Sequence, residues 1–581
     1  MLTYKKKRDG IAGFGLVGIS FIFFQFFYPY HLFFKEQMQL FLYTSDYFLS
    51  YFNKPAWLAR YIGDFLTQFF YLRGGGATVL AIIFLLEWIL CLTVIKRVTN
   101  TVKASLWALI PAGIDFVLHS GLLYNLSFSV GFILMLCLFL IYTPLSNRWL
   151  SFIAGLGITL IGYRMIGSLI FIFPVVLFAY DRQKKRGFLL KWLLIVIADL
   201  LIPFSFRNSY LLTRKQSFIF PAFDIKSMLL PVSLVLVILA VFSLKKAESQ
   251  HPLIINSSVL FILLLLLTGG INRNADFHLE KILSLDGETY FGNTDRVIML
   301  SKKYNMKDRR ATYFTNIALA KKGIFPDSLL NYYQPASYSL ILPVAPGESW
   351  MSIVFSSEVF YLVGDMNMAQ HAAMLGNTFS PGQRSSRLVK RLAEINMVNG
   401  DTAAAGKYLR ILSKTLFYKR WAATRQKINH ASATAGWLLE KRKQIARADT
   451  LLKANDYLSS LNFLVEQNPD NLVALDYLMC FYLLNKDLRS FRKMYDRYGR
   501  FIHRPVPSIY NEALLIELFA EQSSREEVLA YAISPRKTAD FITYTRLYDQ
   551  TKGDMNTLKE PFGKSYWFYY HFATLKKNCP Q

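Results

Sequence analysis

Charged residues are scarce in this chain, and acidic residues are scarcest in its first half. Charged residues make up 18% of the 581 residues, whereas hydrophobic residues make up 53% and aromatic residues 16%. Only ten of the 39 acidic residues fall in residues 1–270, and the other 29 fall in residues 271–581. This imbalance excludes a purely soluble enzyme, a disordered protein and a fibrous one. The chain divides into an apolar half and an ordinary polar half.

Cysteine and metal-ligand clusters are equally rare. The four cysteines are Cys91, Cys137, Cys480 and Cys579, and none has a CxxC or zinc-site spacing. The eight histidines are scattered, so we expect no metal site built from them. A disulfide between Cys480 and Cys579 is left open, without support from spacing. The sequence motifs of nucleotide-binding loops, serine hydrolases and zinc proteases are absent from any fitting context.

The formal net charge of +27 would suggest nucleic acid, but its distribution does not. Much of the excess in residues 1–270 lies in short loops between apolar segments, where it indicates membrane orientation. The excess in the second half is spread out, apart from a dense stretch from Lys407 to Arg447. We therefore expect no nucleic-acid partner.

The apolar half contains nine candidate membrane spans, since a helix needs about 20 apolar residues to cross the bilayer core. They are residues 11–29, 77–95, 105–123, 126–145, 149–163, 166–180, 190–205, 228–244 and 252–269. The fifth and sixth are short and are separated by Gly162, Tyr163 and Arg164, so a re-entrant hairpin is an alternative. The first segment lacks a small-residue cleavage site and is expected to be a retained anchor.

Lysine and arginine in the loops predict the orientation. With the N-terminus inside, the inside loops together with Lys191 at the edge of the seventh span hold 15 of these residues, and the longer outside loops hold nine. Nine spans would then export the chain from residue 271 onward. For a bacterium with two membranes, this predicts an inner-membrane protein with a cytoplasmic N-terminus and a periplasmic C-terminal domain.

Helical periodicity dominates after residue 345, and three segments share a pattern. Turns at Gly364-Asp365, Asn399-Gly400-Asp401 and Asn485-Lys486-Asp487 accompany small residues such as Ala369, Ala405 and Ala474. The first two turns are 36 residues apart, and the pattern resembles degenerate tetratricopeptide repeats, which run 34 residues. The resemblance implies stacked helix pairs that bind a protein partner; an irregular helical domain is the alternative.

The predicted fold class is therefore all-α. A polytopic transmembrane bundle over residues 1–270 carries an exported loop at 29–76. An exported linker region (271–345), tetratricopeptide-like repeats (346–500) and a C-terminal helical cap (501–581) follow.

The first exported loop, residues 29–76, is long, aromatic and amphipathic, which favours short helices along the membrane surface. Glu36 stands just after the first span, and Asp46 follows. This arrangement resembles the membrane half of GT-C glycosyltransferases, which have an acidic residue at this place and use a lipid-linked sugar donor. The resemblance implies a catalytic role for Glu36, with Asp46 second. The usual paired acids are absent, because Lys35 precedes Glu36 and Gln37 follows it.

Such a carboxylate can accept the proton of an acceptor hydroxyl or hold a divalent metal, although no cofactor is identified. Arg207, Arg214 and Lys215 lie in the later exported loop 206–227. They are candidates for binding the phosphate of a lipid-linked sugar or, equally, the headgroups of membrane lipids. The alternative for the acids is that they balance neighbouring cations on a solvated face.

Three acids fall inside predicted spans, namely Glu87, Asp115 and Asp199. An ionisable group there costs about 2.5–3.5 kcal/mol, so it usually has a partner or a role. Asp115 and His119 are four residues apart on one helical face, which favours a proton relay or a buried hydrogen-bonded pair. Glu87 is interpreted as lying near an edge from which it reaches water.

Most of the chain also resembles an uncharacterised family of bacterial polytopic membrane proteins with a helical-repeat tail. The resemblance rests on FKEQMQLFLYTSDYFLSYF, RLAEINMVNGDTAAAGKYLRILSKTLFYKRWA and YLMCFYLLNKDL. It implies an architecture without a reaction. The leading expectation is a GT-C-like transferase in cell-envelope glycan assembly. A non-enzymatic envelope scaffold and a small-solute carrier using Asp115, His119 and Asp199 are the alternatives.

Overall fold

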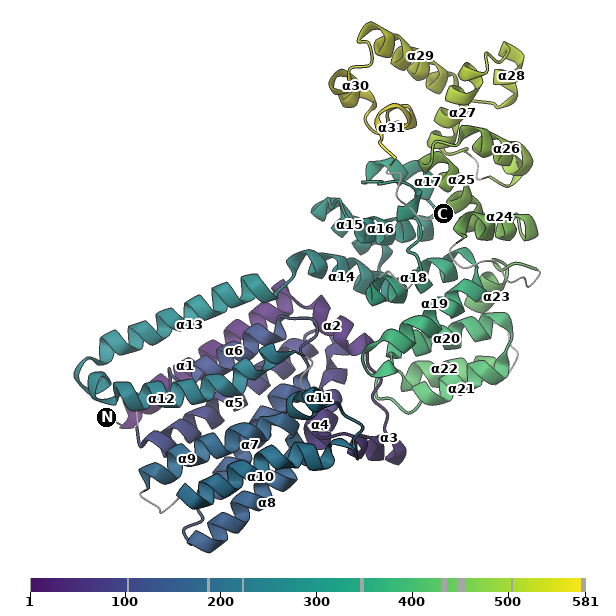
Figure 1. The fold of residues 1–581 in the computed structure, drawn as a ribbon. Helices are drawn as coiled ribbons and strands as arrows, with labels where there is room; N and C mark the ends of the chain where they lie inside the picture. The colour runs from purple at the N-terminus through teal and green to yellow at the C-terminus, as the bar shows by residue number, and fades with distance from the viewer. Residues whose placement is uncertain are drawn as a thin grey trace. The chain divides into compact units, whose positions relative to one another are not determined.

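The computed structural model describes residues 2–101, 104–184, 189–221, 224–344, 349–430, 436–447, 456–502 and 505–575. Throughout these residues the regular elements are helices, which agrees with the predicted all-α class (Figure 1). The chain forms two compact units. Unit 1 contains Met1–Glu280 with Lys414–Phe417, and unit 2 contains Lys281–Ser413 with Tyr418–Gln581.

Unit 1 is a bundle of apolar helices around a core of buried aliphatic and aromatic side chains. Its main helices are α1 (Leu2–Ile22), α5 (Gly75–Thr99), α6 (Leu109–His119), α7 (Leu126–Tyr142), α8 (Arg148–Ile166), α9 (Phe173–Gln183), α10 (Leu189–Arg207), α12 (Leu229–Gln250) and α13 (Pro252–Asn274). Many large apolar side chains on α10, α12 and α13 are exposed, as expected for helices that face lipid.

The number of helices long enough to cross a membrane is smaller than the nine expected. Five helical segments of the described residues pass by length and composition, or six if α1 and the bent helix after it count as one span. Helices α6 and α7 are apolar but only 11 and 17 residues long. The expected fifth and sixth spans form one continuous helical segment, Arg148–Gln183.

That continuous segment folds back on itself. Lys191 Nζ lies 3.0 Å from Ser151 Oγ near its start and 3.0 Å from Asp181 Oδ2 near its end. In a straight helix, residues 151 and 181 would be about 45 Å apart. The reversal occurs at Gly167 (φ 68°), where the 3₁₀ segment Gly167–Ile172 begins. The expected break at Gly162–Arg164 lies within α8 instead.

Hydrogen bonds gather the loops of unit 1 at two ends of the bundle. At one end they join loops that the charge pattern predicts to be inside: Lys245 Nζ with Thr99 O at 3.1 Å, Tyr180 OH with Thr143 O at 2.9 Å, and Arg97 with Thr143. At the other end they join loops predicted to be outside: Asn274 Nδ2 with Val117 O at 2.7 Å, Lys54 Nζ with Tyr210 O at 2.8 Å, and Ser168 Oγ with Ile219 O at 2.9 Å. We call the second group the outer end.

The loop 29–76 folds into short helices, as its amphipathic sequence predicts. They are α2 (Tyr30–Gln37), α3 (Ser45–Ser50) and α4 (Trp57–Thr67). Helix α1 continues through a π-helical turn, Phe23–Phe27, and α2 then departs from it at 78°. Pro29 stands at the bend, where its missing N–H interrupts the helical hydrogen bonds.

Unit 2 consists of helices packed in sequence, and it begins within the expected linker region. Residues 271–345 contain α14 (Phe277–Tyr290), α15 (Thr294–Tyr304), α16 (Arg309–Lys321) and α17 (Phe325–Ser328), so most of this region is helical. The next helices are α18 (Trp350–Val363), α19 (Met366–Phe379), α20 (Ser386–Asn399), α21 (Thr402–Leu412), α22 (Lys419–His430), α23 (Gly436–Arg442), α24 (Tyr457–Gln467), α25 (Leu472–Leu484) and α26 (Leu488–Tyr498). Helices α27 (Ser508–Ala520), α28 (Arg525–Ala530), α29 (Pro535–Gln550), α30 (Met555–Phe562) and α31 (Tyr566–Phe572) complete the unit.

Helices α18 to α22 pack side by side as a stack of hairpins (Figure 1). The three turns singled out in the sequence share one design. Gly364, Gly400 and Lys486 all have positive φ, and each ends a helix. The aspartate after each accepts a hydrogen bond from the backbone of the next helix, at 2.8–3.0 Å. The sequence pattern therefore marks a repeated left-handed turn followed by an N-cap.

Candidate functional site

Helix α2 lies across the outer ends of three bundle helices. Leu32 packs against Gly76 at the start of α5. His31 Nε2 lies 3.0 Å from the carbonyl oxygen of His119, where α6 ends. Lys35 Nζ donates to the carbonyl oxygen of Tyr124, just before α7, at 3.0 Å. The bend after α1 therefore inserts a polar helix into the outer end of the bundle.

A carboxylate holds the start of α2 in place. Glu280 accepts hydrogen bonds from the backbone N–H groups of Tyr30 at 2.6 Å and His31 at 2.9 Å. Its carboxylate also lies 3.6 Å from His31 Nδ1. A negative group at these unpaired N–H groups stabilises the N-terminus of a helix. Glu280 stands 250 residues later in the sequence than Tyr30, and no local pattern predicted this contact.

Asp115 and His119 form the core of a buried network, as their spacing predicted. Asp115 Oδ1 accepts hydrogen bonds from Tyr124 OH at 2.6 Å and from Ser129 Oγ at 2.9 Å. His119 Nε2 lies 2.9 Å from Ser129 Oγ and 3.5 Å from Asp115 Oδ2. Asp115 and Ser129 are fully buried and His119 is almost so. These groups occupy one water-excluded site between α6 and α7.

Glu87 joins this network instead of reaching water, so the interpretation of a snorkelling residue is corrected. It is fully buried on α5 and interacts with Asp115. Neither of its carboxylate oxygens has a hydrogen-bond donor among the described residues. Two ionised carboxylates can only accept hydrogen bonds, so a direct bond between Glu87 and Asp115 requires that one of them carries a proton.

Lys35 is the basic group nearest to the same site: a charge on it favours the ionised Asp115 carboxylate, while burial lowers the pKa of the Lys35 ammonium to about 7. The cluster thus combines two carboxyl groups, a lysine and a histidine below α2. If the apolar helices span a membrane as the sequence predicts, an ionisable cluster among them is a functional-site candidate by default.

Glu36 lies next to this cluster but is itself buried, with 3% of its surface exposed. Glu36 lies close enough to Tyr71 to act on its phenol. Burial first, and then the charge of Glu36, raise the pKa of the Tyr71 phenol. Asp46 has a different environment. It is exposed in the first turn of α3, where Thr44 caps the helix. The two candidate catalytic acids are therefore not equivalent.

The exposed cations Arg214 and Lys215 open helix α11 (Arg214–Ile219), and Arg207 is half-buried at the end of α10. Their loop meets the loop 29–76 through two other basic residues. Lys54 Nζ donates to Tyr210 O at 2.8 Å, and the Arg60 guanidinium lies 5.4 Å from the centre of the Phe220 ring. The structure thus joins the two loops that the sequence pairs.

Asp64 is a half-buried acid of the loop 29–76 that stands outside the pair of candidate catalytic acids. Its Oδ2 accepts a hydrogen bond from Tyr51 OH at 2.6 Å, and Tyr51 OH lies 2.7 Å from Tyr47 OH. Burial raises the pKa of Asp64, although the Tyr51 hydrogen bond and the nearby Arg60 act in the opposite direction. This chain of hydroxyl groups fixes α3 against α4.

Asp199 stands apart from the Asp115 network. It is buried on the face of α10 that carries Ile195, and Ile195 packs against Gly155 of α8. Within the described residues no hydrogen bond joins Asp199 to Asp115 or His119. The three intramembrane residues expected to act together are therefore split between two places.

The described residues contain no group of three or more His, Cys, Asp or Glu side chains placed to hold a metal ion. Cys480 is fully buried in α25, and Cys579 lies outside the described residues.

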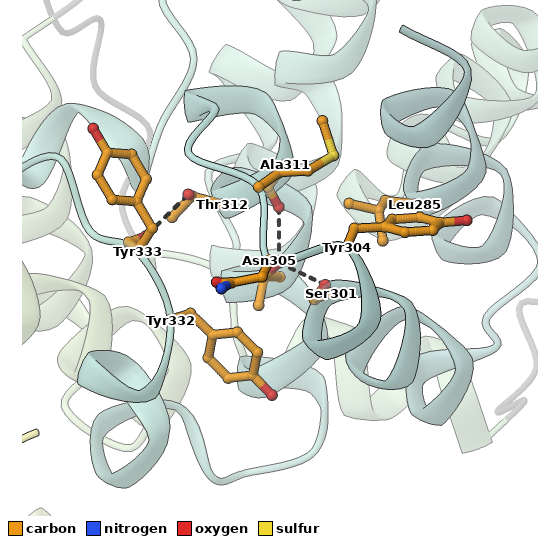
Figure 2. Close-up of a pocket in the computed structure, with 10 residues that line it drawn as sticks. Leu285, Ser301, Tyr304, Asn305, Ala311, Thr312, Tyr332 and Tyr333 are labelled. Atoms are coloured by element: carbon orange, nitrogen blue, oxygen red, sulfur yellow. Dashed lines mark hydrogen bonds between the residues drawn. The ribbon is translucent and has the colours of Figure 1, made fainter. Parts of the chain in front are cut away.

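Unit 2 contains a small polar cavity of about 20 Å³ between α15, α16 and residues 332–333 (Figure 2). Thr312 Oγ1 donates to Tyr333 O at 3.0 Å beside it. Its volume suits one water molecule.

The sequence profile of a family of unknown function, DUF6057, matches residues 4–573. The chain belongs to this family. The match covers both units and agrees with the resemblance to an uncharacterised family. No curated protein and no solved structure matches the chain.

Proposed function

We propose that this protein is a multispanning membrane protein that transfers a sugar from a lipid-linked donor at the outer face of the membrane, as GT-C enzymes do. The observation that carries the proposal is the course of α2. The helix turns 78° away from α1 and carries Glu36 onto the outer ends of α5 to α7. Short interfacial helices follow it, in the order that the GT-C resemblance implies.

In this proposal Glu36 accepts the proton of the acceptor hydroxyl. Its burial keeps bulk water from the carboxylate. Acceptor entry then requires the chain that covers Glu36 to move. Arg207, Arg214 and Lys215 would bind the donor phosphate, because the loop that carries them is joined to the loop 29–76 through Lys54 and Tyr210.

Lys35 would act as a positioning residue. Its ammonium donates to the carbonyl oxygen of Tyr124 and acts on Asp115, so it fixes α2 and the adjacent Glu36. This role offers a physical reason for a lysine where GT-C enzymes usually have a second acid.

The test compares Glu36→Gln with Asp46→Asn in a strain that lacks the gene. Loss of a general base lowers a rate by about 10²–10⁴-fold. Glu36→Gln should therefore accumulate lipid-linked sugar, as the deletion strain does, while the protein reaches the membrane in normal amounts. Asp46→Asn is the matched control on the same loop. Normal lipid-linked sugar levels with both variants would exclude the transferase proposal.

A carrier is the second candidate, and the buried Glu87–Asp115 pair favours it. Two carboxyl groups in contact in an apolar site can hold and release one proton, which is the chemistry of proton-coupled transport. In proteoliposomes, Glu87→Gln should abolish proton uptake driven by solute, whereas Glu36→Gln should leave it intact. No solute-driven proton uptake by the unmodified protein would exclude the carrier.

The proposed orientation places unit 2 on the periplasmic side of an inner membrane, where its hairpin stack would bind an envelope partner protein. A stack of helix pairs offers a continuous surface for such a partner. The 15-to-9 distribution of loop lysine and arginine supports the orientation. A phosphatase fused after Gln581 should be active, and a reporter that works only in the cytoplasm should be silent there.

A further inference from the structure

An aromatic cavity of about 200 Å³ lies in unit 2 between residues 330–334 and the helices α30 and α31. The side chains of Tyr332, Phe568, Tyr569 and Phe572 form much of its wall. For comparison, an apolar cavity of about 150 Å³ is large enough to bind benzene. The cavity therefore has room for a single six-membered ring with a short substituent.

The wall formed by α31 is fixed by contacts on its other side. Tyr566 OH donates to Leu483 O at 2.8 Å, and Tyr569 OH donates to Leu484 O at 2.9 Å. Trp567 Nε1 donates to Glu512 O at 2.9 Å. These bonds hold α31 on α25 and α27, so the cavity is preformed. Preformed aromatic walls are typical of binding sites for small molecules.

Phe568 and Phe572 are not needed for that attachment. They are one helical turn apart, their ring centres lie 4.8 Å from each other, and both rings are only half-buried. Tyr566 and Trp567, by contrast, are completely buried in the core. The sequence thus places two large apolar rings at a partly open wall, where a ligand ring would gain contact with both.

Most of the polar groups around the cavity already have hydrogen-bond partners within the protein. Gln334 Nε2 donates to Asn316 Oδ1 at 2.9 Å, and Gln334 Oε1 accepts from Ser339 Oγ at 3.1 Å. Tyr569 uses its hydroxyl hydrogen on Leu484 O. A sugar ring would leave several hydroxyl groups without partners here, which is unfavourable. The wall suits an apolar ring better.

One positive charge lies at the edge of the cavity. Lys486 Nζ donates to the carbonyl oxygen of Ala573, which lines the cavity, at 2.5 Å. No carboxylate among the described residues forms an ion pair with this ammonium. Its other contact is the ring of Tyr570, 5.9 Å away. An ammonium has three N–H donors, so Lys486 can still bind an anionic group.

We propose that this cavity binds a small aromatic carboxylate. The ring would lie among Tyr332, Phe568 and Phe572, and the carboxylate would pair with Lys486. Burial of the ring supplies affinity, and the ion pair selects an acid over its neutral analogue. The site is independent of the chemistry proposed for Glu36.

The experiment is calorimetric titration of the full-length protein in detergent with three probes. They are 3-phenylpropanoate, the neutral 3-phenylpropanol and propanoate, which lacks the ring. The acid should bind about tenfold more tightly than the alcohol, as expected for one charge-assisted hydrogen bond. Propanoate should not bind, because it cannot fill the aromatic wall.

Two variants and a control locate the site. Lys486→Met should remove the tenfold preference but keep the affinity for the alcohol, whereas Ala573→Leu should fill the cavity and abolish both. Lys564→Met, a change at an exposed lysine, should leave both affinities unchanged. Equal binding of acid and alcohol to the unmodified protein, or no binding of either, would overturn the proposal without depending on any variant. Unchanged binding to Ala573→Leu would overturn it as well.

Discussion

Arg387 Nη2 lies 2.7 Å from Asp286 Oδ1, and the two side chains are 1% and 2% exposed. This ion pair ties α20 to α14, over a separation of 101 residues. The same guanidinium lies 3.0 Å from Glu358 Oε1 on α18. One buried arginine therefore fixes three helices of unit 2. Asp286 depends on it most, because a buried charge without a partner is strongly destabilising, whereas Glu358 also pairs with Arg391 Nη2 at 2.6 Å.

Arg387→Lys should destabilise unit 2 by about 3 kcal/mol, because a lysine ammonium cannot bridge two carboxylates as the planar guanidinium does. Amide hydrogen exchange of α14, α18 and α20 in the full-length protein measures the change. Arg497→Lys is the control, since its pair with Glu466 is exposed and should contribute less than about 1 kcal/mol. Equal effects of the two changes would contradict the assigned role of Arg387.

Glu358 predicts a pH dependence for the same unit. Burial alone would raise the pKa of Glu358, but Arg391 and Arg387 outweigh burial and lower it to about 2. In the unfolded chain the pKa is about 4.3. The folded state therefore favours the ionised form, which stabilises unit 2 above pH 4.3 and ceases to do so as the pH falls toward 2.

The measurement compares the wild type with Glu358→Gln at pH 7 and at pH 3. The difference in the melting temperature of unit 2 should be large at pH 7 and smaller at pH 3, because the wild type loses part of the ionised contribution. A difference that stays constant over this range would show that the charge of Glu358 does not stabilise the fold.

The turns of unit 2 were predictable because their signals are local. A glycine or lysine at positive φ followed by an aspartate cap is visible in the sequence, and the structure has it at all three places. The cluster around Asp115 was predictable only in part. The spacing of Asp115 and His119 showed that they share a face. The electrostatic interactions of Lys35 and Glu87 with Asp115 depend on tertiary packing, which no local pattern contains.

The span count failed for a related reason. Hydropathy detects apolar segments, but it does not show whether a short segment such as α6 is a complete crossing. The hydropathy pattern also placed the break of the α8–α9 hairpin at Gly162, because the polar residues Tyr163 and Arg164 follow there. The chain actually reverses at Gly167, and Gly162 allows the returning residue Ile170 to approach closely. The reversal depends on backbone geometry more than on hydropathy.

The aspartate caps give a graded prediction for unit 2. Asp401 accepts a hydrogen bond from Ala404 N at 2.8 Å and is exposed, so Asp401→Ala should cost about 1 kcal/mol. Asp365 caps α19 and also binds Ser460, a buried contact, so Asp365→Ala should cost more. Asp470→Ala, at an exposed aspartate, should change stability by less than about 0.5 kcal/mol. Hydrogen exchange of α19 and α21 measures these losses of stability. If Asp365→Ala and Asp401→Ala cost no more than Asp470→Ala, the caps would not stabilise the helices.

Gly167 makes the sharpest prediction for unit 1. Its φ of 68° disfavours a side chain, and a Cβ there would lie 2.4 Å from the carbonyl oxygen of Phe220. The same Cβ would also lie 3.1 Å from Ala56 Cβ, so the alanine would push on both loops that meet at the outer end. Gly167→Ala should therefore cost more than about 2 kcal/mol and separate these loops.

Gly157→Ala is the matched control on the preceding helix, because a Cβ there meets nothing within 4 Å. Removing a glycine from a helix interior should stabilise it by up to about 1 kcal/mol. Thermal unfolding in detergent, followed together with protease cleavage at residues 206–221, distinguishes the two. Gly167→Ala should melt earlier and be cut faster, whereas Gly157→Ala should resist both at least as well as the wild type. If both variants behaved alike, the reversal of the chain would not lie at Gly167, and the junction between the loops 29–76 and 206–221 would lose its structural basis.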